Sequence, residues 1–190
     1  PPSGHPMEAL QASLAALGMF FPAKEDAWES ILHLVAKTTT LVAAFHRVRH
    51  GEEALAPRED LGHAANFFYM LTGKEPSAPV ARVLDACLIL HAEPTMNAST
   101  FAARVVGSTQ ANPYSVISAA VGALSGPLHG GANEEVLEML DEIGDHSKAK
   151  AWLEDAIATK KKIMGFGHRV YKVKDPRATV LQELAEHVFT

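Results

Sequence analysis

The clearest indication of an α-helical fold comes from residues 26–50, which read DAWESILHLVAKTTTLVAAFHRVRH. Apolar side chains recur in this segment at steps of three and four residues, the spacing that gathers them on one stripe of an α-helix. The stripe is formed by Ile31, Leu34, Val35, Leu41, Val42 and Phe45. Gly51 follows directly, and glycine commonly ends a helix. We therefore predict one long amphipathic helix over these residues.

Helix start signals occur on both sides of this segment. Pro6 stands where a first helical residue is expected, ahead of apolar residues with helical spacing. Asn112-Pro113 and Asp175-Pro176 each place a capping side chain directly before a proline, which predicts two further helix starts. Asp60 is expected to cap a helix over residues 61–72, and Ser77 one that runs to residue 91. The sequence thus predicts an all-α fold with short loops.

Two segments differ from ordinary amphipathic helices. The helix expected over residues 113–124 is rich in small side chains, which permit another helix to approach closely; they are Ser118, Ala119, Ala120, Gly122 and Ala123. Such a face fits a tight core or a dimer interface equally well. Residues 162–174, with their glycines and Val170-Tyr171, are the one place where the pattern favours extended structure.

The composition excludes several classes of protein. The chain has 190 residues, of which 47% are hydrophobic and 21% charged, with a net charge of −5. This charge gives no attraction to nucleic acids or anionic membranes. No apolar run approaches the ~18 residues that cross a bilayer, and residues 1–6 lack the order of a signal peptide. The single cysteine, Cys87, excludes an internal disulfide. We expect a cytoplasmic globular protein that binds neither nucleic acid nor membrane.

Three polar or glycine-rich segments interrupt the helical pattern and are the candidates for chemistry. They are residues 91–100 (HAEPTMNAST), 125–133 (SGPLHGGAN) and 165–177 (GFGHRVYKVKDPR). The second and third place His129 and His168 beside glycines, which permit positive φ angles and close approach of a ligand. An imidazole exposed in this way can move protons or polarise a carbonyl group.

Cationic side chains surround the second histidine. Arg169, Lys172, Lys174 and Arg177 lie within ten residues of it, which suits a ligand with carboxylates or phosphates. The sequence Gly165-Phe166-Gly167 is by itself a weak signal that most often marks a turn, and no dinucleotide-binding fingerprint follows it.

No metal site is predicted. His46 and His50 are four residues apart on the long helix, a spacing compatible with metal ligation. Because Arg47 and Arg49 lie between them and no third ligand is near in the sequence, a solvated basic helix face is the better interpretation.

The chain resembles the citrate synthase family, of the shorter bacterial kind, at several segments that occur in family order from end to end. These are residues 126–133, 165–171 and 175–177, with 97–101, 5–7 and 60–67. The resemblance implies a mostly helical homodimer with a large domain and a smaller mobile one. In this chain residues 1–130 would belong to the large domain and residues 131–190 to the small, CoA-binding domain.

The resemblance also implies a reaction, the condensation of acetyl-CoA with oxaloacetate and water to give citrate and CoA at the entry to the citric acid cycle. The position of His129 holds the acetyl carbonyl group while a carboxylate removes a methyl proton. The position of His168 donates a hydrogen bond to the oxaloacetate carbonyl group. Arg177 matches an arginine that binds an oxaloacetate carboxylate. No metal or cofactor is implied, because acetyl-CoA enters as a substrate.

Further site residues follow from the same resemblance. His91, Asn97 and Ser99 fall in the substrate-binding region, and Ser99 matches a hydroxyl that orients the histidine equivalent to His129. The expected CoA-binding residues comprise a loop against the adenine and a base that meets a phosphate: Ile163, Met164, Gly165, Phe166, Gly167 and Lys172.

Two departures from the family pattern bear on activity. Pro94 stands where the family has a histidine that binds oxaloacetate, and proline has no side-chain donor. One carboxylate contact is therefore lost or supplied by another group. The family's catalytic aspartate lies well beyond the third segment, and no aspartate follows Asp175 here. We expect this chain to be a fragment of a longer enzyme and inactive by itself.

Three alternatives to citrate synthesis stay open. In the first, the full-length protein is a 2-methylcitrate synthase that uses propionyl-CoA. In the second it is a non-catalytic homologue that binds an acyl-CoA or a carboxylate, and in the third this segment is only a dimerisation core. Pro94 favours the second alternative, whereas the presence of both His129 and His168 argues against it.

Overall fold

The computed structural model describes residues 3–23, 26–92, 96–167 and 172–189. The chain forms two units, the first made of residues 1–123 and 175–190 and the second of residues 124–174. Across the described ranges every regular element is a helix, which confirms the all-α prediction. The boundary predicted at residue 130, between a large domain and a smaller mobile one, stays a prediction.

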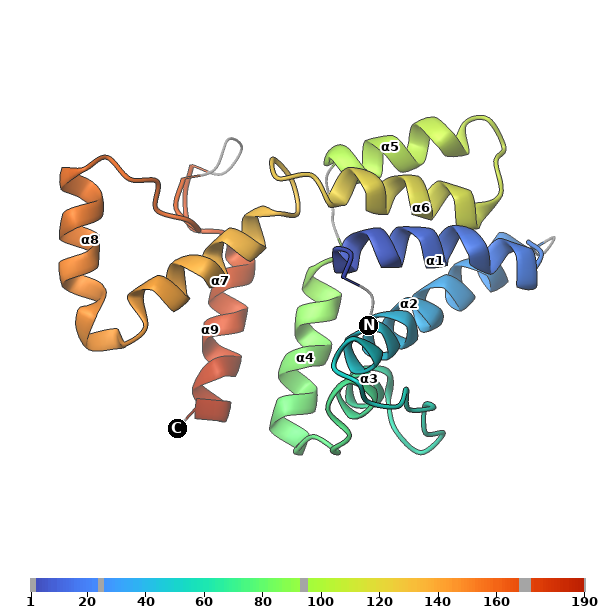
Figure 1. Ribbon diagram of the computed structural model, residues 1–190, viewed down its shortest axis with the longest axis horizontal. Helices are drawn as coiled ribbons and strands as arrows, with labels where there is room; N and C mark the ends of the chain where they lie inside the picture. The colour runs from blue at the N-terminus through green and yellow to red at the C-terminus, as the bar shows by residue number, and fades with distance from the viewer. Residues whose placement is uncertain (1–2, 24–25, 93–95, 168–171, 190) are drawn as a thin grey trace. The chain divides into compact units, whose positions relative to one another are not determined.

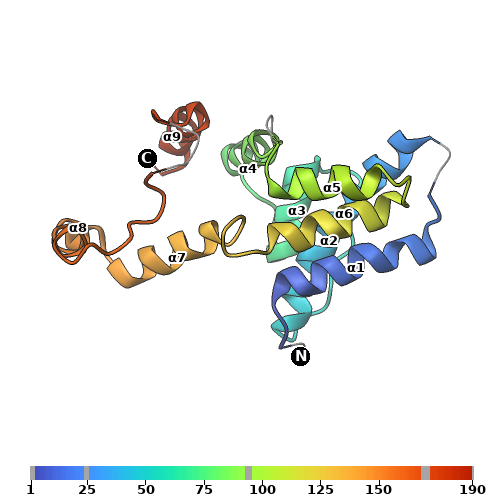
Figure 2. The same ribbon diagram turned by 90° about the horizontal axis from the view of Figure 1, so that it is seen from above.

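The first unit contains most of the helices (Figures 1 and 2). They are α1 (Pro6–Phe20), α2 (Ala27–Arg49), α3 (His63–Thr72), α4 (Ala78–Leu90), α5 (Ala98–Gly107), α6 (Pro113–Leu124), whose last residue opens the second unit, and α9 (Pro176–Phe189). The second unit contains α7 (Ala132–Ile143), the 3₁₀-helix η1 (His146–Lys148) and α8 (Ala149–Ala158). The long helix predicted for residues 26–50 is α2. In the described part of the chain, no helix has both the length and the hydropathy needed to cross a membrane.

The core of the first unit lies where α1, α2 and α6 meet, and its buried side chains are Leu14, Leu34, Tyr114 and Val121. The small residues of α6 bring it close to α1. The hydroxyl of Ser118 donates to the backbone oxygen of Gln11 at 3.0 Å. A Cβ atom at Gly122 would lie only 2.5 Å from Nε2 of the same glutamine. Ser118 and Gly122 therefore serve close packing within the chain.

The two proline-associated helix starts are confirmed. Oδ1 of Asn112 accepts a hydrogen bond from the backbone N–H of Tyr114 at 2.9 Å, at the start of α6. Oδ1 of Asp175 accepts one from the backbone N–H of Arg177, also at 2.9 Å, at the start of α9. Each cap satisfies a backbone donor that the first turn of a helix leaves without an internal partner.

Of the two other predicted caps, the one at Asp60 was wrong and the one at Ser77 was right in position. Helix α3 begins at His63 with Gly62 at its N-cap, because the carboxylate of Asp60 instead binds the guanidinium of Arg58. That arginine also lowers the pKa of Asp60, as expected for a carboxylate paired with a cation. Ser77 occupies the N-cap of α4 as predicted, although its side chain makes no capping hydrogen bond, and α4 ends at Leu90 with His91 at its C-cap. No strand forms among the described residues of 162–174; Val170 and Tyr171 lie outside the described ranges.

The side chain of Asn66 fixes the loop that precedes α3. Its Oδ1 accepts from the backbone N–H of Arg58 at 2.9 Å, and its Nδ2 donates to the backbone oxygen of the same residue at 2.5 Å. The amide of Asn66 thus pairs with both backbone groups of Arg58, as a neighbouring strand would in a sheet. Both bonds are partly shielded from water.

We expect Asn66→Ala in the full-length protein to lower the free energy of unfolding by about 1–3 kcal/mol, because two partly buried backbone groups of Arg58 lose their partner. Urea denaturation followed by circular dichroism measures the change. Asn66→Asp keeps the acceptor but sets a carboxylate oxygen against the backbone oxygen of Arg58, so it should also be destabilising. An alanine variant as stable as the wild type would show that the two bonds contribute nothing.

Candidate active site

His129 lies on a tight turn between α6 and α7, in the second unit. Its backbone N–H donates to the oxygen of Gly126 at 2.9 Å, and the N–H of Gly130 donates to the oxygen of Leu124 at 3.0 Å. The N–H of Gly131 also donates to Gly126, at 3.3 Å. These bonds use backbone groups only, and the imidazole itself is partly exposed. The turn therefore holds the position of the histidine independently of what its ring binds.

The glycines after His129 are required by space rather than by their φ angles. A Cβ atom at Gly130 would overlap the backbone oxygen of Leu124, and one at Gly131 would lie 2.9 Å from Cα of Pro127. Gly131 has an ordinary φ of −61°, and Gly130 is not among the described residues with positive φ. Of the two properties that glycine permits, this pair uses close approach and not positive φ.

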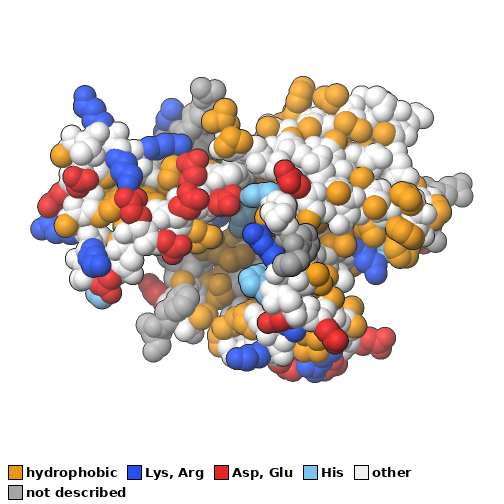
Figure 3. All heavy atoms as spheres, viewed as in Figure 1, with side chains coloured by type: hydrophobic (Ala, Val, Ile, Leu, Met, Phe, Trp, Pro, Cys, Tyr) orange, Lys and Arg blue, Asp and Glu red, His pale blue; other side chains and the backbone are white. Residues whose placement is uncertain are grey.

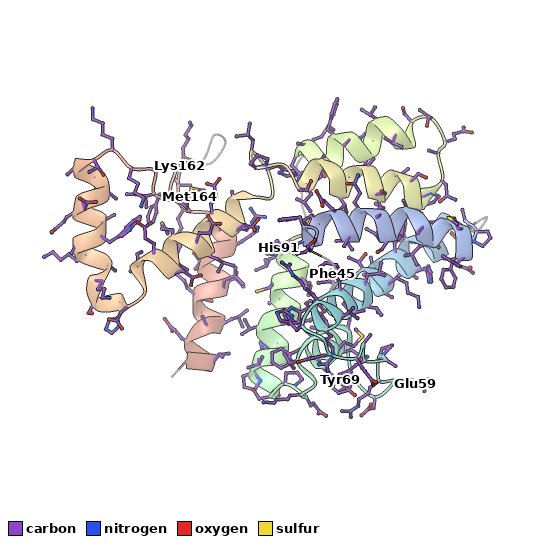
Figure 4. The ribbon with its side chains drawn as sticks, in the orientation of Figure 1. Phe45, Glu59, Tyr69, His91, Lys162 and Met164 are labelled. Atoms are coloured by element: carbon purple, nitrogen blue, oxygen red, sulfur yellow. The ribbon has the colours of Figure 1, made fainter. Side chains whose placement is uncertain are left out.

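Positive φ angles do occur in the second glycine-rich segment. Gly165 and Gly167 have φ angles of 82° and 76°, in the left-handed region that favours glycine. The loop that contains them lies over the first turns of α7, because a Cβ atom at Gly165 would be 4.0 Å from the side chain of Val136. Nearby, Nζ of Lys162 is 3.7 Å from a carboxylate oxygen of Glu135 (Figure 4 labels Lys162).

A stronger ion pair anchors the start of this loop. Nζ of Lys161 lies 2.5 and 2.6 Å from the two carboxylate oxygens of Glu142 and also stands 5.2 Å from the ring centre of Trp152. Hydrogen bonds from Lys161 and Trp152 lower the pKa of Glu142. Because the pKa of Glu142 is lowered in the folded state, the ion pair contributes its full stabilisation at pH values above the ordinary carboxyl pKa. This stabilisation is lost as the pH falls through the lower, folded-state pKa.

The expected CoA-binding residues of the second unit therefore lie on or next to a loop that the ion pairs of Lys161 and Lys162 hold against α7. Ile163 and Met164 are partly buried (Figure 4 labels Met164), whereas Phe166 exposes 78% of its surface. Lys172 is exposed. An exposed aromatic ring on a glycine-rich loop offers a flat ligand an apolar surface. His168 lies outside the described residues.

Arg177 makes several polar contacts within the first unit. Its guanidinium binds the carboxylate of Asp175 through Nε, at 3.1 Å to each oxygen, and through Nη2 at 2.7 Å. Its Nη1 points to the backbone oxygen of Leu90 at 3.4 Å. The arginine thus joins the first turn of α9 to the last residue of α4.

His91 caps the C-terminus of α4, next to the residue that Arg177 contacts (Figure 4). Its Nδ1 lies 2.6 Å from the backbone oxygen of Cys87. Because a carbonyl oxygen only accepts, Nδ1 carries a proton, and Nε2 of the neutral ring is an acceptor. His91 can donate a hydrogen bond to a carboxylate only when its ring is protonated.

Asn97 and Ser99 lie together at the start of α5. Oδ1 of Asn97 accepts from the hydroxyl of Ser99 and from the backbone N–H of Thr100, both at 2.9 Å. A carboxylate ligand would therefore have to meet the amide NH₂ of Asn97. The segment between His91 and these residues includes Pro94, which lies outside the described ranges.

The structure thus brings the predicted residues together in three groups, each within one unit. The end of α4 meets Arg177, Asn97 meets Ser99, and the turn of His129 leads into the helix on which the loop 163–167 lies. The first two groups belong to the first unit and the third to the second.

Comparison with known proteins identifies the family. The family model described as citrate synthase, C-terminal domain, matches residues 1–190. The chain belongs to the citrate synthase family. It is 56% identical over 194 residues to a citrate synthase from Synechocystis sp., covering 100% of this chain and 49% of that protein. It is also 43% identical over 193 residues to a 2-methylcitrate synthase from Mycobacterium tuberculosis, again covering 100% of this chain and 49% of the relative.

The fold agrees with this assignment. The crystal structure of citrate synthase from Pyrobaculum aerophilum matches with a TM-score of 0.80 and 41% identity, over 97% of this chain and 50% of that one. The citrate synthase resemblance seen in the sequence is thereby confirmed, together with its multi-helical fold. The chain spans about half the length of the curated relatives it matches.

Sequence reasoning missed several groups that support the site of this citrate synthase family member. Asp175 was interpreted only as a helix cap, although it also binds the guanidinium of Arg177. The signal was available, because an aspartate two residues before an arginine at a helix start brings the two side chains within reach. Glu135 and Glu142, which hold the loop of the second unit, gave no such signal, because their lysine partners lie 27 and 19 residues further along the chain.

Proposed function

We propose that the full-length protein condenses acetyl-CoA with oxaloacetate and water to give citrate and CoA. The observation that carries this proposal is the turn of His129, whose backbone bonds fix the imidazole directly before the helix on which the loop 163–167 lies. The similarity to citrate synthases supports the same conclusion.

The proposed mechanism assigns separate roles to the candidate residues. His129 donates a hydrogen bond to the thioester carbonyl oxygen while a carboxylate of the full-length protein removes a proton from the methyl group. The resulting enol carbon attacks the keto carbon of oxaloacetate, and His168 donates a proton to the oxygen that becomes the alcohol. Water then hydrolyses the citryl thioester and releases CoA as a thiol. Hydrogen bonds aimed at the developing oxyanions supply the stabilisation, and we propose that no metal ion or cofactor takes part.

Arg177 would bind one carboxylate of oxaloacetate, because its guanidinium is a planar donor that matches a carboxylate. His91, Asn97 and Ser99 would complete that side of the site. The loop 163–167 would contact the adenine of CoA, with Phe166 as the exposed ring, and Lys172 would meet a phosphate group. The expected cytoplasmic location stays a prediction.

The second candidate function is 2-methylcitrate synthesis, which the relative from Mycobacterium tuberculosis favours. Thiol release by the full-length protein, measured with oxaloacetate and either acetyl-CoA or propionyl-CoA, separates the two. We expect the larger kcat/KM with acetyl-CoA. A larger value with propionyl-CoA would support the second candidate. Binding of oxaloacetate without thiol release from either thioester would identify a non-catalytic homologue.

We also propose that the full-length protein is a homodimer. Large apolar side chains stand exposed on three helices of the first unit, and apolar side chains that gather on a surface often mark an interface. On α1, α2 and α5 they include Met19 (79% exposed), Phe20 (72%), Trp28 (66%), Leu32 (64%), Phe101 (58%) and Val105 (52%). Figure 3 shows hydrophobic side chains spread over the surface of α1, α5 and α6. A second copy of the protein would cover these side chains.

We expect Phe101→Asp to convert the dimer to a monomer at micromolar concentration, because a carboxylate placed in an apolar interface loses its hydration without a partner. Light scattering after gel filtration measures the mass. Ile157→Asp is the matched control, since Ile157 is similarly exposed (64%) but lies on α8 of the second unit. A Phe101→Asp protein with the mass of the wild type would show that α5 is outside any interface.

A further inference from the structure

The carboxylate of Asp175 occupies one complete edge of the Arg177 guanidinium. Nε lies 3.1 Å from both carboxylate oxygens, and Nη2 lies 2.7 Å from Oδ2. These two nitrogens form the side edge of the planar group. The other edge that matches a carboxylate at two points is the end edge, between Nη1 and Nη2, so a carboxylate ligand that binds in this geometry beside Asp175 would have to use it. Asp175 therefore determines which edge of Arg177 a ligand meets.

The guanidinium is also held from a second direction. Nη1 lies 3.4 Å from the backbone oxygen of Leu90, the last residue of α4, and Arg177 is 32% exposed at its side chain. An arginine side chain that is free in solution loses considerable rotamer entropy when it binds a ligand. Here much of that entropy is already lost in the folded protein, so the group is preorganised for its ligand.

Capping alone does not explain this arrangement. Asp26 caps α2 in the same way, since its Oδ1 accepts from the backbone N–H of Trp28 at 2.9 Å, two residues further on. Asp175 makes the equivalent bond to the N–H of Arg177, also at 2.9 Å, and in addition binds the side chain of that residue. The two aspartates thus share the cap and differ in the guanidinium contact.

We propose that Asp175 is a positioning residue that orients Arg177 to bind a carboxylate of oxaloacetate, an inference that rests on the proposed function. Because the pair of Asp175 and Arg177 has no net charge, its affinity for a carboxylate depends on the direction of the N–H groups. Loss of Asp175 would leave the positive charge of Arg177 in place and remove its orientation. We therefore expect removal of Asp175 to weaken oxaloacetate binding. This is the opposite of what charge alone predicts, because the removal of a negative charge would by itself favour an anionic ligand.

The test is Asp175→Asn in the full-length protein. Asparagine is an equally good N-cap, so α9 keeps its start, but its NH₂ group would stand where Oδ2 accepts from Nη2, and two donors would then face each other. We expect KM for oxaloacetate to rise about 10-fold or more, because a small displacement of a binding group is costly. KM for acetyl-CoA and the melting temperature should stay near those of the wild type, and kcat should change less than KM for oxaloacetate.

Two comparisons make the result specific. Asp26→Asn removes the same charge from a cap without an arginine, and it should leave KM for oxaloacetate unchanged. In a protein that already carries Arg177→Gln, the further change Asp175→Asn should have no additional effect on that KM, since the group that Asp175 orients is gone.

The outcomes distinguish this inference from the proposed function. An Asp175→Asn enzyme that condenses oxaloacetate with the wild-type KM would overturn the inference and leave the proposed function intact. The same holds if the increase in KM persists in the Arg177→Gln protein. A wild-type protein that neither binds nor condenses oxaloacetate would overturn both.

Discussion

Replacement of His129 by alanine in the full-length protein should lower kcat by about 100-fold to 10,000-fold, the range expected when a group that assists proton transfer or stabilises an oxyanion is removed. The backbone bonds of the turn involve the N–H groups of residues 129 to 131 and not the imidazole, so the turn should persist. Steady-state thiol release measures kcat. KM for oxaloacetate should change much less, because the role proposed for His129 concerns the thioester.

The matched control for this prediction is His146→Ala. The side chain of His146 is 97% exposed in η1 and belongs to none of the candidate groups, so its loss should leave kcat unchanged. A His129→Ala protein whose kcat stays within about threefold of the wild type, with an intact circular dichroism spectrum, would contradict the assignment of His129.

Gly130→Ala should have the second largest effect, because an added methyl group would overlap the backbone oxygen of Leu124. That oxygen also accepts the hydrogen bond of the Gly130 N–H, so the methyl group cannot be accommodated without opening the turn. We expect the free energy of unfolding to fall by about 1–3 kcal/mol. We also expect kcat to fall by about 100-fold, because displacement of His129 misplaces its donor.

Gly62→Ala is the control for the glycine prediction. Gly62 has a φ of −65°, and a Cβ atom there would meet nothing within 4 Å. The alanine variant should keep full activity and lose less than about 1 kcal/mol of stability, the difference between glycine and alanine at an N-cap. If Gly130→Ala behaved like Gly62→Ala, the turn would be more tolerant than its geometry indicates, and the role given to its close packing would be wrong.

The sequence was sufficient where a structural feature depends on neighbouring residues. Helix α2 follows from the periodicity of its own apolar side chains, and the starts of α6 and α9 follow from an Asn-Pro and an Asp-Pro pair that act within three residues. The family resemblance added the residues of the candidate site, because its segments occur in order along the whole chain.

The sequence was insufficient where two groups compete or where distant segments meet. Asp60 had two possible partners, and the charged guanidinium of Arg58, which also binds Glu75, was preferred over the helix N-terminus. The reason for Gly130 is an approach of the turn to its own preceding helix end, which composition does not reveal. The contact between Arg177 and Leu90 spans 87 residues, so it required the packing of α9 on α4.

The bond between His91 and the oxygen of Cys87 limits how this side chain can meet a bound molecule. Because Nδ1 lies against the end of α4, Nε2 is the ring nitrogen that remains to face a ligand. The ring cannot turn its other nitrogen outward without breaking the bond, so a ligand has to adapt its position to the ring.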